Sequence, residues 1–162
     1  HFKRGEELID FDEACIEIRA QHDRFVEIVG REPDYFEAHA VMSKNLNRAI
    51  SAVAQELGLK EQKASFDPTA VVHCGDTDLR MVMRSMEPGY EPKEAIMQTV
   101  REMADDETVV FVCHPGYLDR FILESSSLTT DRTKEVDALI DPELRAWLEA
   151  QDDLHLIDYR DL

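Results

Sequence analysis

Cysteine is scarce in this 162-residue sequence, and its spacing excludes the sites that cysteines usually build. Cys15, Cys74 and Cys113 are odd in number and form no Cys-x-x-Cys pair. Neither a disulfide framework nor a structural zinc knuckle is therefore expected. Free thiols persist in a reducing compartment, so we expect a cytoplasmic protein.

Long apolar runs are also missing. No run approaches the ~20 residues that cross a bilayer, and no charged-then-apolar leader opens the chain. We therefore expect no membrane role. The chain opens on His1 rather than methionine, which predicts that it is part of a longer gene product.

Motifs for phosphate binding and serine catalysis are absent too. The chain has no Gly-rich phosphate loop or dinucleotide fingerprint, and no Gly-x-Ser-x-Gly elbow. Basic residues are few: the chain has 18 Lys and Arg and 35 Asp and Glu, which gives a net charge of −17. Such an excess repels phosphate backbones and anionic lipid, so nucleic-acid binding is not expected.

What remains is an alternation of helical and strand patterns, with hydrophobic residues at 43% of the chain. Three-and-four spacing of apolar residues predicts helices, and short runs rich in β-branched residues predict strands. The expected helices are 12–29, 43–57, 92–103, a segment through Val136, Leu139 and Ile140, and 141–148; the expected strands are 34–39, 69–74, 108–113 and 154–159.

This order predicts an α/β fold of alternating βα units with parallel strands, forming a single domain over residues 1–162. Four such units cannot close an eight-stranded barrel, which takes ~250 residues. The pattern leaves two arrangements open, a small open sheet or the C-terminal half of a barrel.

Two expected strands end in a histidine. The run Val109 to Cys113 leads directly into His114-Pro115-Gly116, which predicts a strand buried on both faces, and the strand at 34–39 ends at His39. Because carboxyl ends of parallel strands share one rim, both imidazoles are candidates for metal binding or proton transfer. The alternative for each is a strand-end hydrogen bond.

Two carboxylates accompany these histidines. Glu37 shares a strand face with His39 and is able to orient its ring, although a surface ion pair is an equal alternative. Asp119 follows His114 in the next loop, either as a catalytic carboxylate or as a helix cap. Cys113 points to the opposite strand face from His114, so a Cys-His nucleophile is not expected.

At these residues the chain resembles YdjC-like carbohydrate deacetylases. The run Cys113-His114-Pro115-Gly116-Tyr117-Leu118-Asp119 carries the resemblance most strongly, and it covers most of the chain, least between residues 60 and 105. The other segments that carry it are Glu17 to Gln21, Ser126 to Thr129, Arg132, Glu135 and the closing run Ile157 to Leu162.

The resemblance implies a TIM-barrel-like fold, with this chain as its C-terminal part. It implies the removal of acetyl groups from N-acetylated sugars or oligosaccharides with a divalent ion, Mg²⁺ or Zn²⁺. His39 matches a metal-binding histidine of the family and His114 the histidine held to be catalytic. Glu37 stands where the family usually has Asp.

The chain also departs from the family. Val41 and Ser43 replace two further histidines of the metal-binding strand, which indicates a divergent subfamily. The family's amino-terminal Asp residues and first metal-binding histidine have no counterpart, so the chain alone lacks a complete metal site.

Two other functions stay open. A non-catalytic carbohydrate-binding or regulatory relative would keep the fold without the metal. Another metal-dependent hydrolase, such as a phosphoesterase, is a third option, because a fold does not fix its substrate. A homodimer is expected from base rates alone.

Overall fold

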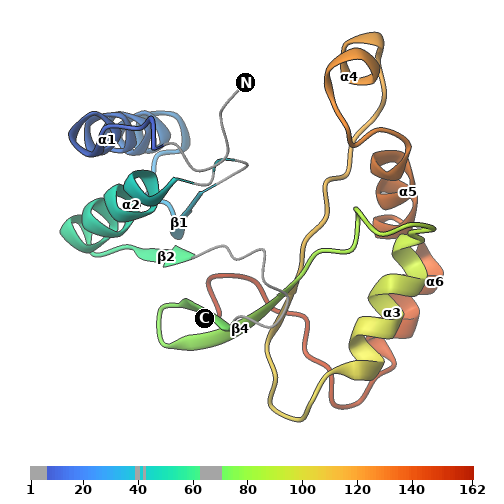
Figure 1. Ribbon diagram of the computed structural model, residues 1–162. Helices are drawn as coiled ribbons and strands as arrows, with labels where there is room; N and C mark the ends of the chain where they lie inside the picture. Colours follow the sequence, from blue (N-terminus) through green and yellow to red (C-terminus); the bar gives the residue numbers. More distant parts are fainter. Residues whose placement is uncertain (1–6, 39–40, 42, 63–70) are drawn as a thin grey trace. The chain divides into compact units, whose positions relative to one another are not determined.

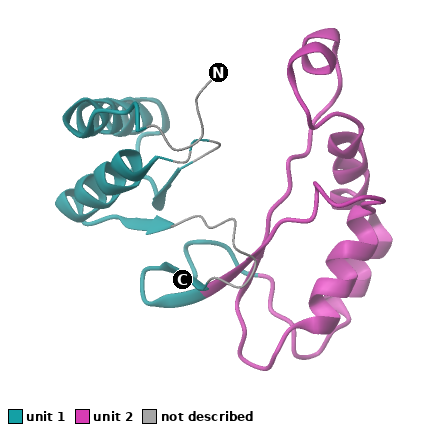
Figure 2. Cartoon of the chain, in the orientation of Figure 1, with its two compact units in different colours: residues 1–66, 71–78, 157–162 teal, residues 67–70, 79–156 magenta. Residues whose placement is uncertain are grey.

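A computed structural model describes residues 7–38, 41, 43–62 and 71–162. The chain divides into two compact units (Figure 2). The first comprises residues 1–66, 71–78 and 157–162, and the second residues 67–70 and 79–156. The single domain expected for residues 1–162 stays a prediction.

Two helices dominate the first unit, and they lie side by side (Figure 1). Helix α1 (Phe11–Val29) is capped by the Asp10 carboxylate, and α2 (Lys44–Leu57) by the Ser43 hydroxyl, which accepts from the Leu46 N–H at 3.0 Å. Both helices end at a glycine in left-handed conformation, α1 at Gly30 and α2 at Gly58. The core between the helices contains Ala14, Cys15, Ala49 and Val53.

Three short strands complete the first unit: β1 (Tyr35–Glu37), β2 (Lys60–Gln62) and β3 (Val71–Cys74). β1 pairs with β2 in parallel, Tyr35 opposite Lys60, but β2 pairs with β3 antiparallel, Gln62 opposite Cys74. The expectation of parallel strands is therefore only partly right. Strand β4 then follows β3 after the two-residue turn Gly75-Asp76, with no helical crossover between them.

The second unit contains a parallel pair joined by a helix, but its first strand, β4, was not among the strands predicted from the sequence. Strand β4 (Thr77–Val82), which belongs to this unit from Leu79 onward, pairs with β5 (Val109–Phe111), and α3 (Pro92–Glu102) connects them. Arg80 and Glu107 form a bidentate ion pair beside the strands. Arg80 Nε lies 2.5 Å from Glu107 Oε1, and Arg80 Nη2 lies 2.9 Å from Glu107 Oε2. β5 is half-buried rather than buried on both faces, because β4 is its one strand neighbour among the described residues.

Helices form the rest of the second unit: α4 (Arg120–Ser125), α5 (Thr130–Leu139) and α6 (Pro142–Glu149). α3, α5 and α6 pack together, whereas α4 lies at the end of a projecting loop and buries no residue (Figure 1). The face of α5 differs from the one expected: Leu139 and Ile140 are exposed, and Glu135 and Ala138 are buried instead.

The strand expected at 154–159 does not form. Its residues make local bonds that compete with a sheet, since the Asp158 carboxylate accepts from the Arg160 N–H at 2.8 Å and the Asp158 N–H donates to Asp161 at 2.9 Å. From Ile157 onward the segment belongs to the first unit, where the Tyr159 ring packs 4.1 Å from that of Tyr35. Among the described residues, no helix is both long and apolar enough to span a membrane.

Candidate active site

His114 lies three residues beyond the end of β5, whereas the sequence predicted it directly after the strand. The pairing with β4 continues one residue past β5, where the Val112 N–H donates to the Val82 carbonyl at 2.8 Å. The chain then leaves the sheet, and His114 opens the Pro-Gly segment. Its side-chain Nδ1 is buried and has no hydrogen-bond partner among the described residues.

The backbone of this His-Pro-Gly segment is held by α5. The His114 N–H donates to Glu135 Oε2 at 2.5 Å, and its carbonyl accepts from Arg132 Nη1 at 3.3 Å. The Gly116 N–H donates to the Arg132 carbonyl at 3.3 Å. One helix therefore fixes the peptide groups on both sides of the candidate proton donor.

Cys113 is inert by its surroundings. Burial, and secondarily the nearby Glu135 carboxylate, raises the pKa of the thiol to about 11. Little thiolate is present at neutral pH, and only the thiolate is a good nucleophile. This agrees with the expectation that Cys113 and His114 do not form a nucleophilic pair.

Asp119 caps a helix in the structure. Its Oδ1 accepts from the Ile122 N–H at 2.8 Å at the start of α4, which is one of the two roles that the sequence left open. The carboxylate is exposed, and its catalytic role stays a prediction. Tyr117, between His114 and Asp119, is 81% exposed.

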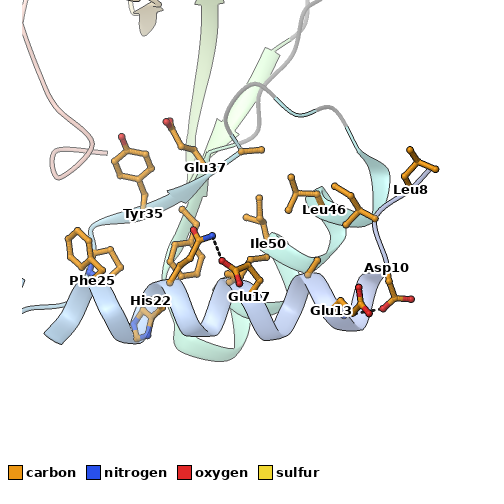
Figure 3. Close-up of a pocket in the computed structure, with 17 residues that line it drawn as sticks. Leu8, Asp10, Glu13, Glu17, His22, Phe25, Tyr35, Glu37, Leu46 and Ile50 are labelled. Atoms are coloured by element: carbon orange, nitrogen blue, oxygen red, sulfur yellow. Dashed lines mark hydrogen bonds between the residues drawn. The ribbon is translucent and has the colours of Figure 1, made fainter. Parts of the chain in front are cut away.

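In the first unit, β1 directs Tyr35 and Glu37 away from α1 (Figure 3). Phe36 faces the helices, where its ring meets that of His22 edge-on with the centroids 6.1 Å apart. His39 lies outside the described residues, so the structure gives it no contacts. Glu37 therefore keeps both of its predicted roles.

A cavity of about 740 Å³ lies between α1, α2 and β1 (Figure 3). Its walls are mostly apolar, with Ile18, Phe25 and Ile50 among them. Glu17 is turned to Gln21, whose Nε2 donates to it at 2.8 Å. We assign no catalytic site to this cavity.

No group of three or more His, Cys, Asp or Glu side chains suited to a metal ion occurs among the residues that the structure describes. The metal ligand expected from the sequence, His39, lies outside the described residues. The described residues alone thus do not fit the expected ion. His73 pairs with Asp78 at 2.6 Å on the surface.

Glu135 and Arg132 are the site residues that local pattern reasoning missed, since the sequence singled them out only through the resemblance. A signal was present, because a glutamate three residues before Ala138 lies on the same side of a helix as that apolar residue. A carboxylate on a buried helix face needs a polar partner, so this position predicts one for Glu135.

The family model described as YdjC-like protein matches residues 1–150. The chain is 27% identical over 154 residues to carbohydrate deacetylase 2 of Listeria innocua, covering 93% of this chain and 60% of that protein. It is 26% identical over 151 residues to the chitooligosaccharide deacetylase of Citrobacter koseri, covering 86% and 58%.

A solved structure shares the fold. The crystal structure of a putative cellobiose-phosphate cleavage protein from Enterococcus faecalis superposes with a TM-score of 0.71 at 21% identity. The match covers 94% of this chain and 61% of the other. The chain thus spans about 60% of the length of the proteins it matches.

Proposed function

The chain belongs to the YdjC-like family, and we propose that it supplies the proton donor, His114, of a metal-dependent deacetylase acting on N-acetylated sugars or oligosaccharides. The substrate class is suggested by the names of two relatives, a carbohydrate deacetylase and a chitooligosaccharide deacetylase. The observation that carries the proposal is His114 itself, beyond the end of β5 with its backbone fixed by Glu135 and Arg132.

The reaction explains why a proton donor is needed. Water adds its oxygen to the acetamide carbonyl carbon, the carbon–nitrogen bond breaks, and the products are acetate and a free sugar amine. An amine leaves poorly as an anion, so its nitrogen must be protonated as the bond breaks. His114 gives that proton, and removing it is expected to slow turnover by about 10²–10⁴-fold.

A divalent ion, Mg²⁺ or Zn²⁺, completes the proposal, with His39 as one ligand. When bound, such an ion lowers the pKa of a water molecule and polarises a carbonyl. Elemental analysis of the full-length protein beside a His39→Ala variant tests this part. We expect a near-stoichiometric ion that the variant loses; no ion in either protein after metal loading contradicts it.

Acetate release from an N-acetylated chitooligosaccharide tests the activity. The variant is His114→Ala, and the matched control is His155→Ala, because His155 is an exposed histidine of the second unit. We expect the control to keep the rate of the unaltered protein and His114→Ala to lose it. Equal turnover in all three removes His114 from the reaction. Sugar binding without acetate release and without an ion would instead indicate a non-catalytic carbohydrate-binding relative.

A further inference from the structure

Glu135 is a buried acid, and the free energy lost by taking its carboxylate out of water must be offset by other contacts. Its side chain is 1% exposed, and a carboxylate taken out of water is destabilising unless donors replace its hydration. No ion pair with a basic side chain involves it among the described residues. Its two oxygens are instead held by neutral donors, the Tyr90 hydroxyl at 2.9 Å and the His114 N–H at 2.5 Å.

The Glu135 carboxylate binds the backbone of His114 rather than its ring, which is unusual for a carboxylate beside a functional histidine. Carboxylates commonly orient an imidazole by accepting from its ring N–H. Here Glu135 accepts from the backbone of His114, while the ring Nδ1 is buried without a partner among the described residues. The hydrogen bonds that α5 makes to His114 are therefore made to its backbone.

Arg132 supplies the second half of the same contact. It lies three residues before Glu135, so the two side chains leave α5 on one side. Its guanidinium donates to the His114 carbonyl at 3.3 Å and to the Leu128 carbonyl at 3.0 Å. The N–H and C=O of a single residue are thus fixed by one helix, and Pro115 restricts the backbone that follows.

We propose that Glu135, assisted by Arg132, is a positioning residue that aims His114 by fixing its backbone. This inference rests on the proposed function, since it assigns Glu135 a role in the same proton transfer. A misplacement of about 1 Å is enough to cost 10²-fold in rate. Loss of the Glu135 contact therefore lowers kcat about 10–100-fold and leaves KM nearly unchanged, because a carboxylate that is 1% exposed is out of reach of a bound substrate.

The test compares Glu135→Ala, Glu135→Gln and Leu79→Ala in the full-length protein. Leu79 is 1% exposed in the same unit and lies in β4 rather than α5, so its truncation is matched for burial. Glutamine keeps one oxygen that accepts from the His114 N–H, and Tyr90 is able to reorient its hydroxyl to accept from the new amide. It is the conservative rescue, and it covers the case in which Glu135→Ala does not fold.

Two measurements are made on each folded variant. The first is the chemical shift and hydrogen exchange of the His114 amide by NMR, which reads the contact without any substrate. The second is kcat and KM for acetate release from an N-acetylated chitooligosaccharide. We expect Glu135→Ala to lose both amide protection and kcat, Glu135→Gln to recover most of each, and Leu79→Ala to keep both.

Each failure has its own signature. Acetate release by the unaltered protein together with an unchanged kcat in Glu135→Ala overturns the positioning role. An equal fall of kcat in Leu79→Ala also overturns it, because a general loss of stability then explains the effect. If the unaltered protein releases no acetate, the proposed function is overturned. The catalytic role of the contact between Glu135 and His114 is then overturned as well, whether or not the NMR signal of the His114 amide changes in Glu135→Ala.

Discussion

The Tyr90 hydroxyl donates to the Glu135 carboxylate across 2.9 Å, and both side chains are almost fully buried, at 5% and 1% exposure. Burial, and then the neighbouring carboxylate, raises the pKa of Tyr90 well above its usual range. The phenol therefore stays protonated and keeps donating at neutral pH. Glu135 depends on this donor for one of its two oxygens.

Replacing Tyr90 with phenylalanine is expected to lower the free energy of unfolding by about 1.5–3 kcal/mol, because a buried carboxylate oxygen loses its donor. Urea unfolding measures the change. The control is Tyr117→Phe, the same chemical change on a side chain that is 81% exposed, where we expect almost none. Equal losses in the two variants would show that the buried contact contributes nothing specific.

His22 gives the first unit a pH-dependent term. Its buried ring lies 2.6 Å from a Glu32 oxygen and 3.2 Å from an Asp23 oxygen, and these two carboxylates raise the pKa of the imidazole, Glu32 most. The folded state thus binds the proton more tightly than the unfolded chain does. The stabilisation is complete below the unfolded pKa of about 6.5 and is lost as pH rises through the higher folded pKa.

We therefore expect the free energy of unfolding to fall above pH 6.5, relative to a His22→Gln variant that lacks the group. Chemical denaturation at a series of pH values measures the difference. His155→Gln serves as the control, because His155 is exposed. A difference between wild type and His22→Gln that stays constant across pH would contradict this coupling.

Local information explains which elements the sequence revealed. Helix α2 was predicted with both ends, because Ser43 and Gly58 are adjacent in sequence to the helix they cap. Strand β2 was not, because its residues Lys60, Glu61 and Gln62 have little preference for strands and become one through pairing with β1 and β3.

The same distinction holds for the site. His114 was found from the apolar run that precedes it, a pattern within a few residues. Glu135 is buried by a contact to Tyr90, 45 residues away, and by another to His114, 21 residues away. No window of local sequence contains those partners, so Leu139 and Ile140 were predicted on the buried face of α5, although both are exposed.

The three cysteines are expected to resist alkylation in the folded protein. Cys15 and Cys74 are buried, and burial raises the pKa of the Cys74 and Cys113 thiols, that of Cys113 to about 11. Iodoacetamide at pH 8, followed by mass spectrometry, should modify none before urea is added and all three afterwards. A Ser127→Cys variant provides an exposed thiol as the positive control. Rapid labelling of Cys113 in the native state would contradict the raised pKa of its thiol.

Two variants of Asp119 distinguish a role of its carboxylate as a helix cap from a role in catalysis. Asparagine caps a helix about as well as aspartate does but cannot exchange a proton at neutral pH, whereas alanine does neither. A catalytic Asp119 predicts that Asp119→Asn keeps the unfolding free energy and loses acetate release. Asp119→Ala should in addition lose about 1 kcal/mol of stability.

The measurements are urea unfolding and acetate release on the same preparations. Full activity in Asp119→Asn would assign the carboxylate to the cap alone, through its bond to the Ile122 N–H. His114 would then remain the candidate proton donor of this loop, which makes the position of its ring more consequential. Loss of activity at unchanged stability would place a second proton-exchanging group five residues beyond His114, on a loop whose other end α5 already holds.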